Sequence, residues 1–188
     1  MTRIILRALN GPILVCFIIL GVALQSSLFS SWPLFYLQPD LVLLAVFWCA
    51  FRRSFGEGGI ITLIVSNISE IHSAAPQGLY LISYMIVYLS MRAASRFFVV
   101  PTLFSYAMLT LLSSIIWKMV GLFVLYLLGA SANQWRHTLT FLLIGSAVQA
   151  VVSLWVYRWL EKFDWYTFKN ARAERAMEEE LQLESEGF

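Results

Sequence analysis

The stretch EGGIITLIVSNISEIHSAAPQGLY, residues 57–80, contains the feature that decides the fold. An apolar run from Gly58 to Ile71 carries a glutamate, Glu70, one residue before its end. A turn of small residues with Pro76 and Gly78 follows, and a second apolar run then begins. Continuous apolar runs joined by a short turn differ from the short alternating segments of a β-barrel. They predict two neighbouring helices in an apolar environment.

The composition of the whole chain indicates where this environment is. The 188 residues are 60% hydrophobic and only 13% charged, and the mean hydropathy is +0.75. Soluble domains carry about 25% charged residues, so a water-soluble fold of this size has too few charges to cover its surface. The chain is therefore predicted to be an all-α integral membrane protein, built as a bundle of transmembrane helices.

Six apolar segments are predicted to span the membrane. They are residues 11–29, 34–51, 58–72, 77–92, 99–128 and 138–160. They divide the chain into a transmembrane domain, residues 1–160, and a charged, helix-prone tail, residues 161–188. The first span is interpreted as a retained anchor, because no small-residue cleavage site follows it. The third is short, about 21 Å against a hydrocarbon core of about 30 Å, so a hairpin that dips in without crossing stays an alternative.

The basic residues orient these spans. Of the 13 lysines and arginines, all except Lys118 and Arg136 fall on one side of the predicted membrane. Cytoplasmic loops carry the excess of basic residues, so both termini and the tail are predicted to be cytoplasmic. An aromatic belt at the inner interface is predicted from Trp155, Tyr157, Trp159, Trp165 and Tyr166.

Three charged residues in the spans, Asp40, Glu70 and Lys118, lie away from the basic cytoplasmic ends and need a partner. Charges inside a bilayer are costly and usually face the bundle interior. Pro39 fits the first helical turn and Asp40 follows it, so the Asp40 carboxylate is predicted to meet the positive end of a helix dipole. Glu70 lies near the C-terminal end of its span, where the dipole opposes a negative charge. Either the free backbone N–H groups around residues 77–80 hold it, or it pairs with Lys118 at similar depth. In the first case Lys118 extends toward the outer interface.

Other polar residues are assigned structural roles. Gly145, Gln149 and Ser153 recur every four residues, which predicts a helix-packing face or a docking face for another membrane protein. Cys16 and Cys49 lie in apolar runs and are interpreted as small buried hydrophobes without a disulfide.

Catalytic and metal-binding motifs are not evident. Glu70, His72 and His137 are too few and too irregularly spaced to predict a metal site. The sequence shows no nucleophile–base arrangement and no phosphate-binding glycine loop. We therefore expect neither an enzyme, nor a cofactor, nor a nucleic-acid partner.

Residues 38–89 carry a resemblance to a known family. QPDLVLLAVFWCAF, a basic turn and then SEIHSAAPQGLYLISYMIVYL together resemble the rod-shape-determining protein MreD family. Pro39 and Asp40 match the start of the second span in that family. Glu70 stands at its acidic position, where Asp is usual, and Gly78 follows eight residues later. The similarity covers about a quarter of the chain.

The resemblance implies a function and a fold. It implies a non-catalytic scaffold of the bacterial cell-elongation complex, or elongasome, in the inner membrane. Such proteins bind the single-span protein MreC. They link cytoplasmic MreB filaments to peptidoglycan synthesis by RodA and its transpeptidase partner, and so to cell shape. The family is similar in fold to the substrate-binding subunits of ECF vitamin transporters. The alternative expectation is accordingly a small-molecule-binding transporter subunit, in which intramembrane charges mark the substrate path.

Overall fold

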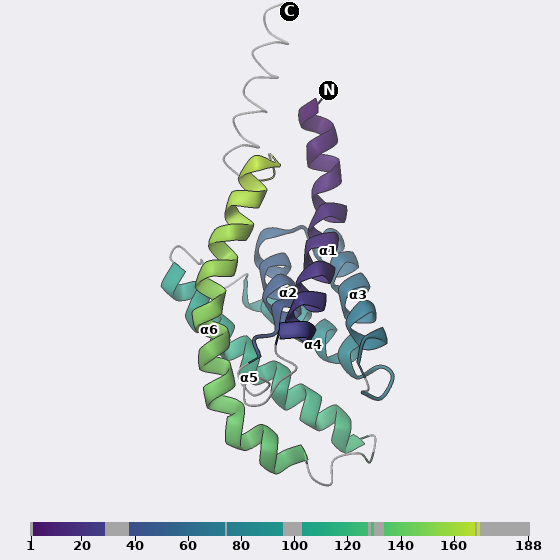
Figure 1. The fold of residues 1–188 in the computed structure, drawn as a ribbon, viewed down its shortest axis with the longest axis vertical. Helices are drawn as coiled ribbons and strands as arrows, with labels where there is room; N and C mark the ends of the chain where they lie inside the picture. The colour runs from purple at the N-terminus through teal and green to yellow at the C-terminus, as the bar shows by residue number, and fades with distance from the viewer. Residues whose placement is uncertain are drawn as a thin grey trace, which may run out of the picture.

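The chain forms six α-helices in a computed structural model (Figure 1). The structure describes residues 2–28, 38–73, 75–95, 103–127, 129, 134–167 and 169. The helices are α1 (Thr2–Leu28), α2 (Leu41–Arg52), α3 (Phe55–Ile71), α4 (Leu79–Ala94), α5 (Leu103–Leu127) and α6 (Gln134–Tyr166). No strand occurs in these ranges, so the predicted all-α fold is confirmed.

Three of the helices are long enough to cross a membrane. Their apolar stretches are Leu9–Ser27, Phe104–Leu127 and Leu142–Tyr166, in α1, α5 and α6. Many large apolar side chains on these helices are exposed, as lipid-facing side chains are. Length, composition and outward apolar surface together make the chain a membrane protein.

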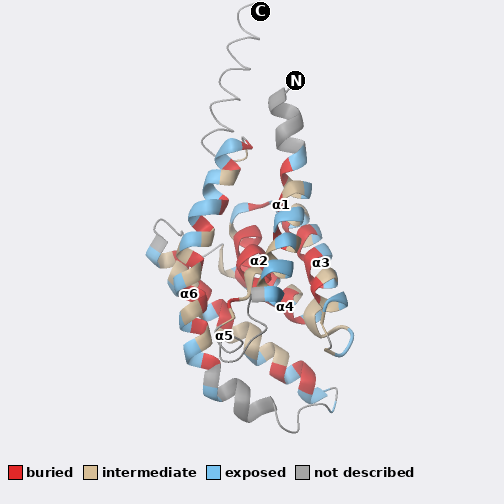
Figure 2. Cartoon of the chain, viewed as in Figure 1, coloured by how far each residue is buried: buried red, intermediate tan, exposed pale blue. Residues whose placement is uncertain are grey.

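The short helix α2 lies at the centre of the bundle. Every residue from Val42 to Ala50 is buried, and Figure 2 shows α2 enclosed by its neighbours. Its 12 residues span only about 18 Å, less than a bilayer core. Because protein surrounds it on all sides, α2 ends inside the bundle, and its capping groups must come from neighbouring helices.

Aromatic rings fill the space between α2, α5 and α6. Tyr157 stacks on Phe47 and Trp48, with ring centroids 5.6 and 5.8 Å apart. The Tyr157 hydroxyl lies 2.8 Å from the Thr110 hydroxyl of α5. The prediction of Tyr157 as an interfacial residue is therefore wrong, because its hydroxyl finds a partner inside the core.

Several helix boundaries differ from the predicted ones. α1 begins at Thr2 rather than at residue 11, and α6 continues to Tyr166 rather than ending at 160. α2 begins at Leu41 rather than at residue 34, and residues 29–37 lie outside the described ranges. Apolar content alone ends a span where charges begin, whereas the backbone stays helical beyond that point. Of the predicted tail, residues 168 and 170–188 also fall outside the described part.

One glycine sets the distance between three helices. A Cβ atom on Gly58 of α3 would lie 2.8 Å from the Tyr88 hydroxyl and 3.1 Å from the Cys49 carbonyl oxygen. The same Tyr88 hydroxyl donates a hydrogen bond of 2.7 Å to the carbonyl of Phe55. Gly58 therefore lets α3 approach both α2 and α4 more closely than any larger residue permits.

Candidate functional site

Glu70 connects the end of α3 to the start of α4. Its two carboxylate oxygens accept hydrogen bonds from the backbone N–H groups of Gly78 and, at 3.2 Å, of Leu81. Gly78 is the N-cap residue of α4 and has a φ of 87°, a left-handed conformation that favours glycine. Of the two predicted partners for Glu70, the structure shows the backbone N–H groups. The proposed pair with Lys118 is absent, since Lys118 Nζ donates to the Leu142 carbonyl at 3.4 Å.

Asp40 connects the start of α2 to two other helices. As N-cap, its Oδ1 accepts the Leu43 N–H at 2.9 Å. Its Oδ2 accepts the Tyr84 hydroxyl of α4 at 2.7 Å. The side-chain amide of Gln149 on α6 bonds both backbone groups of Asp40, at 2.7 Å to N and 2.6 Å to O. The carboxylate therefore lies at the positive end of α2, as predicted, but as its N-cap residue. The prediction that Pro39 belongs to the first helical turn is wrong, because α2 begins at Leu41 and Pro39 precedes the cap.

The small and polar stripe on α6 faces into the bundle. Ser153 and Gln149 are buried, and Gly145 is half-buried. Next to the stripe, Ser146 accepts a hydrogen bond of 3.2 Å from Ser114 of α5. The stripe is therefore a packing face, and the docking alternative is wrong for its two buried members.

A cavity of about 610 Å³ lies beside Asp40. It is partly open and is bounded by residues of all six helices. An aromatic wall borders it, in which Tyr84 stacks on Tyr80 and on Trp117 with centroid distances of 5.8 and 5.6 Å. Lys118 also lines it and is half-buried. Asp40 and Lys118 thus share one cavity without forming a direct ion pair.

A second polar cluster lies at the opposite end of α2. Arg53 Nη2 and Asp164 Oδ1 are 2.5 Å apart, with side chains only 1% and 7% exposed. The other carboxylate oxygen of Asp164 accepts the Trp48 indole N–H at 3.3 Å. Asn10 Nδ2 donates to Asp164 at 3.3 Å and to the Thr167 hydroxyl at 2.5 Å. This Asp164 cluster places the first part of α1 and the last part of α6 at one end of the bundle (Figure 1).

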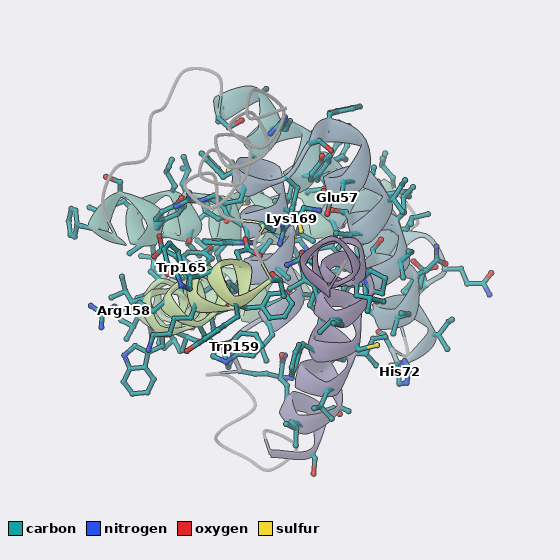
Figure 3. All side chains as sticks on the ribbon, turned by 90° about the horizontal axis from the view of Figure 1, so that it is seen from above. Glu57, His72, Arg158, Trp159, Trp165 and Lys169 are labelled. Carbon is teal, nitrogen blue, oxygen red and sulfur yellow. The ribbon has the colours of Figure 1, made fainter. Side chains whose placement is uncertain are left out.

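Two further contacts strengthen this end. Lys169 Nζ lies 2.5 Å from Glu57 Oε1, and Figure 3 shows the two residues side by side beside α1. Arg92 Nη1 donates to the carbonyls of Ala50 and Arg53 at 2.9 and 3.0 Å, which satisfies the C-terminal end of α2. The residues that follow the last predicted span are therefore anchored to the bundle as far as Lys169.

The Asp164 cluster was not predicted from the sequence. Arg53 was assigned only to a basic cytoplasmic turn, and Asp164 was placed in the tail. The available signal was weak: an aspartate among the aromatic residues of FDWY, and Asn10 next to an apolar run. Neither pattern shows that these residues meet, because they lie 154 positions apart.

An apolar groove of about 450 Å³ runs between α1 and α6. Leu41 and Ala45 of α2 and Gly21 of α1 belong to its lining. The rings of Phe17 and Trp159 meet edge to face, with centroids 5.0 Å apart, where α1 approaches α6. Small residues among larger apolar ones are typical of surfaces where membrane helices approach closely.

The cysteines and the candidate metal ligands occupy separate places. Both cysteines are free. Cys49 is buried as predicted, whereas Cys16 is exposed, which corrects the expectation for that residue. His72 lies at the periphery in Figure 3, with Nδ1 2.9 Å from the carbonyl of Ile68. No group of three potential metal ligands occurs among the residues described, which do not include the side chain of His137.

Comparison with protein families, curated proteins and solved structures finds no match to this chain. Its function is therefore argued from the residues and their geometry.

Proposed function

We propose that the protein is a non-catalytic scaffold of the bacterial cell-elongation complex in the cytoplasmic membrane. In this proposal it spans the membrane several times with both termini in the cytoplasm. It binds an MreC-like single-span protein and connects MreB filaments to wall synthesis by RodA and its transpeptidase partner. The sequence similarity over residues 38–89 supports the proposal, together with the way the structure uses those residues.

The proposal depends mainly on the structural roles of Asp40 and Glu70, the two acidic residues of the motif. Both oxygens of Glu70 are occupied by N–H groups at the start of α4. Both oxygens of Asp40 are occupied by Leu43 and Tyr84. Carboxylates whose acceptor sites are filled this way fix helices relative to each other. A rigid set of short helices suits a platform for other membrane proteins.

The apolar groove between α1 and α6 is the proposed seat for the partner's transmembrane helix. Its lining combines the small residues Gly21 and Ala45 with the large rings of Phe17, Trp155 and Trp159. Small residues allow backbones to approach closely, and van der Waals packing drives helix association in lipid. A single apolar span from an MreC-like protein meets this shape and chemistry.

Co-purification tests the proposed function. The full chain is extracted from bacterial membranes in mild detergent, and bound proteins are identified by mass spectrometry. Recovery of a single-span wall-elongation protein together with RodA is the expected result. Recovery of energising ATPase subunits in their place would contradict the scaffold.

A second candidate function is favoured by the cavity beside Asp40. Ligand pockets commonly enclose about 300–1,000 Å³, and this cavity measures about 610 Å³. A substrate-binding subunit of a vitamin-type transporter would need an outward-facing pocket of this kind. Uptake of a labelled substrate that depends on an ATPase partner would support this candidate over the scaffold.

A further inference from the structure

We infer that the cavity beside Asp40 binds a ligand through an anionic oxygen group, a phosphate or a carboxylate, with Lys118 as its charged contact. This inference goes beyond the proposed function and does not depend on which partner the scaffold holds. It rests on the hydrogen-bonding groups of the cavity wall: the Asp40 oxygens already accept hydrogen bonds, whereas the Lys118 ammonium group has donors left.

Two polar side chains of the cavity wall already hold hydrogen bonds between helices. Asp40 Oδ1 and Oδ2 accept the Leu43 N–H and the Tyr84 hydroxyl at 2.9 and 2.7 Å. Gln149 uses its oxygen and its nitrogen on the backbone of Asp40. These contacts leave Asp40 fewer acceptor sites for a cationic ligand than a carboxylate without partners has.

Lys118 is the donor with capacity left. An ammonium group has three N–H donors, and among the described residues its nitrogen makes one hydrogen bond, of 3.4 Å, to the Leu142 carbonyl. Within the part of the chain that the structure describes, no carboxylate lies within ion-pair distance of it; Asp40, across the same cavity, acts on it only at longer range. Intramembrane charges often mark the path of a substrate or ion. An anionic group in the cavity would give Lys118 a charge partner in direct contact.

The rest of the cavity suits a ligand with an apolar body. Val22, Ile19 and Ile68 line it together with the rings of Tyr80 and Trp117, which are tilted relative to each other. A ligand that carries one anionic head and an apolar portion satisfies both parts of the wall. Two sources share this chemistry: a phospholipid with an anionic head group, and a water-soluble phosphate or carboxylate ester.

Native mass spectrometry of the full-length protein distinguishes these sources. The probes are phosphatidylglycerol, phosphatidylcholine as its zwitterionic counterpart, and glycerol 3-phosphate as a soluble phosphate. We expect about tenfold tighter retention of one anionic probe than of phosphatidylcholine, because the choline cation offsets the phosphate charge and repels the Lys118 ammonium group. Preference for phosphatidylglycerol identifies a lipid source, and preference for glycerol phosphate identifies a soluble one.

Matched variants test the role of Lys118. Lys118→Met keeps the apolar stem and removes the charge, so the preference should vanish; Lys118→Arg should retain it. Lys162→Met makes the same change at an exposed position of α6 and should leave the preference intact. Binding of no anionic probe by the wild-type protein, or equal preference in wild type and Lys118→Met, would overturn the inference.

A measurement on the wild-type protein removes any dependence on variant folding. The acylation rate of the Lys118 amine is followed by peptide mass spectrometry with and without the anionic probe. A fall of severalfold at Lys118, with no change at exposed Lys162, is expected. An unchanged rate at Lys118 under saturating probe would contradict the inference, while leaving the co-purification test of the scaffold unaffected.

Discussion

The two ends of α2 are both built around an aspartate, but they differ in whether that aspartate forms an ion pair. At the end near Asp164, the carboxylate meets the Arg53 guanidinium at 2.5 Å, and both side chains are almost fully buried. At the other end, Asp40 is held by neutral donors, and Lys118, which forms no ion pair within the described residues, donates to the Leu142 carbonyl at 3.4 Å. The first end is closed, whereas the second borders a cavity of about 610 Å³.

This difference assigns separate tasks to the two ends. A closed, charge-paired cluster fixes three helices relative to each other, and breaking it leaves a charge buried without a partner. The open cavity contributes little to stability, because the Lys118 ammonium group makes one hydrogen bond with the described part of the protein. Its remaining N–H donors can bind a ligand. Changes near Asp164 should therefore act mainly on folding, and changes near Lys118 mainly on binding.

The largest effect is expected from breaking the closed cluster. Asp164→Ala leaves Arg53 buried and unpaired, which should lower the free energy of unfolding by about 3–5 kcal/mol. The free energy is measured by SDS titration in mixed micelles. Glu161→Ala is the matched control, because Glu161 pairs with Arg52 at 3.7 Å on the exposed side of α6. Its expected effect is below about 1 kcal/mol, and equal effects of the two variants would contradict the closed cluster.

A smaller loss is expected at the close approach of α3 to α4. Gly58→Ala places a methyl group 2.8 Å from the Tyr88 hydroxyl. Overpacking of this kind lowers stability by about 1–3 kcal/mol, partly offset by the better helix propensity of alanine, up to about 1 kcal/mol. Gly56→Ala in the same helix meets no atom within 4 Å and should be neutral or stabilising. The same SDS titration measures both, and a neutral Gly58→Ala would show that the helices separate freely.

The third effect concerns the junction of α3 and α4. Glu70→Ala leaves the N–H groups of Gly78 and Leu81 without their acceptor, which should lower the free energy of unfolding by about 1–2 kcal/mol. Glu70→Gln retains one acceptor oxygen and should lose less. Thermal unfolding in detergent measures the stability of each variant, and the expected order is wild type, then Glu70→Gln, then Glu70→Ala. An alanine variant as stable as the wild type would mean that this carboxylate does not cap α4.

The smallest effect concerns Glu70 and Lys118. The coupling free energy between these two residues is expected to be near zero. Glu70 and Lys118 bond different groups, so their alanine variants should be additive within about 0.3–0.5 kcal/mol. A double-mutant cycle of unfolding free energies measures this directly. A coupling free energy well above 1 kcal/mol would support the Glu70–Lys118 ion pair, the alternative considered from the sequence.

The sequence predicted the class of fold and the local parts of the candidate site. Apolar runs and few charges were sufficient for an all-helical membrane bundle, and the position of the Asp40 carboxylate at the positive end of a helix follows from its place after Pro39. Glu70 and Gly78 are eight residues apart, so their contact is a local one. These features depend on neighbours in the chain, which is where patterns carry information.

Packing between helices that are distant in the sequence could not be predicted from local sequence patterns. The contact of Asn10 with Asp164 and the burial of Tyr157 depend on how α1 and α6 pack around α2. The cavity likewise arises from residues of all six helices. Hydropathy cannot distinguish an apolar side chain that faces lipid from one that faces another helix, so the central position of α2 was not predicted either.

Site-specific photocrosslinking tests the proposed scaffold most directly. A photoreactive aromatic amino acid replaces Trp155, which lines the groove between α1 and α6 and is 79% exposed. The control replaces Phe104 of α5, which is 70% exposed and outside the groove. In living cells we predict a crosslink from position 155 to the transmembrane span of a single-span wall-elongation protein, and none from position 104. Crosslinks from both positions to lipid alone, with no protein captured at 155, would contradict the account.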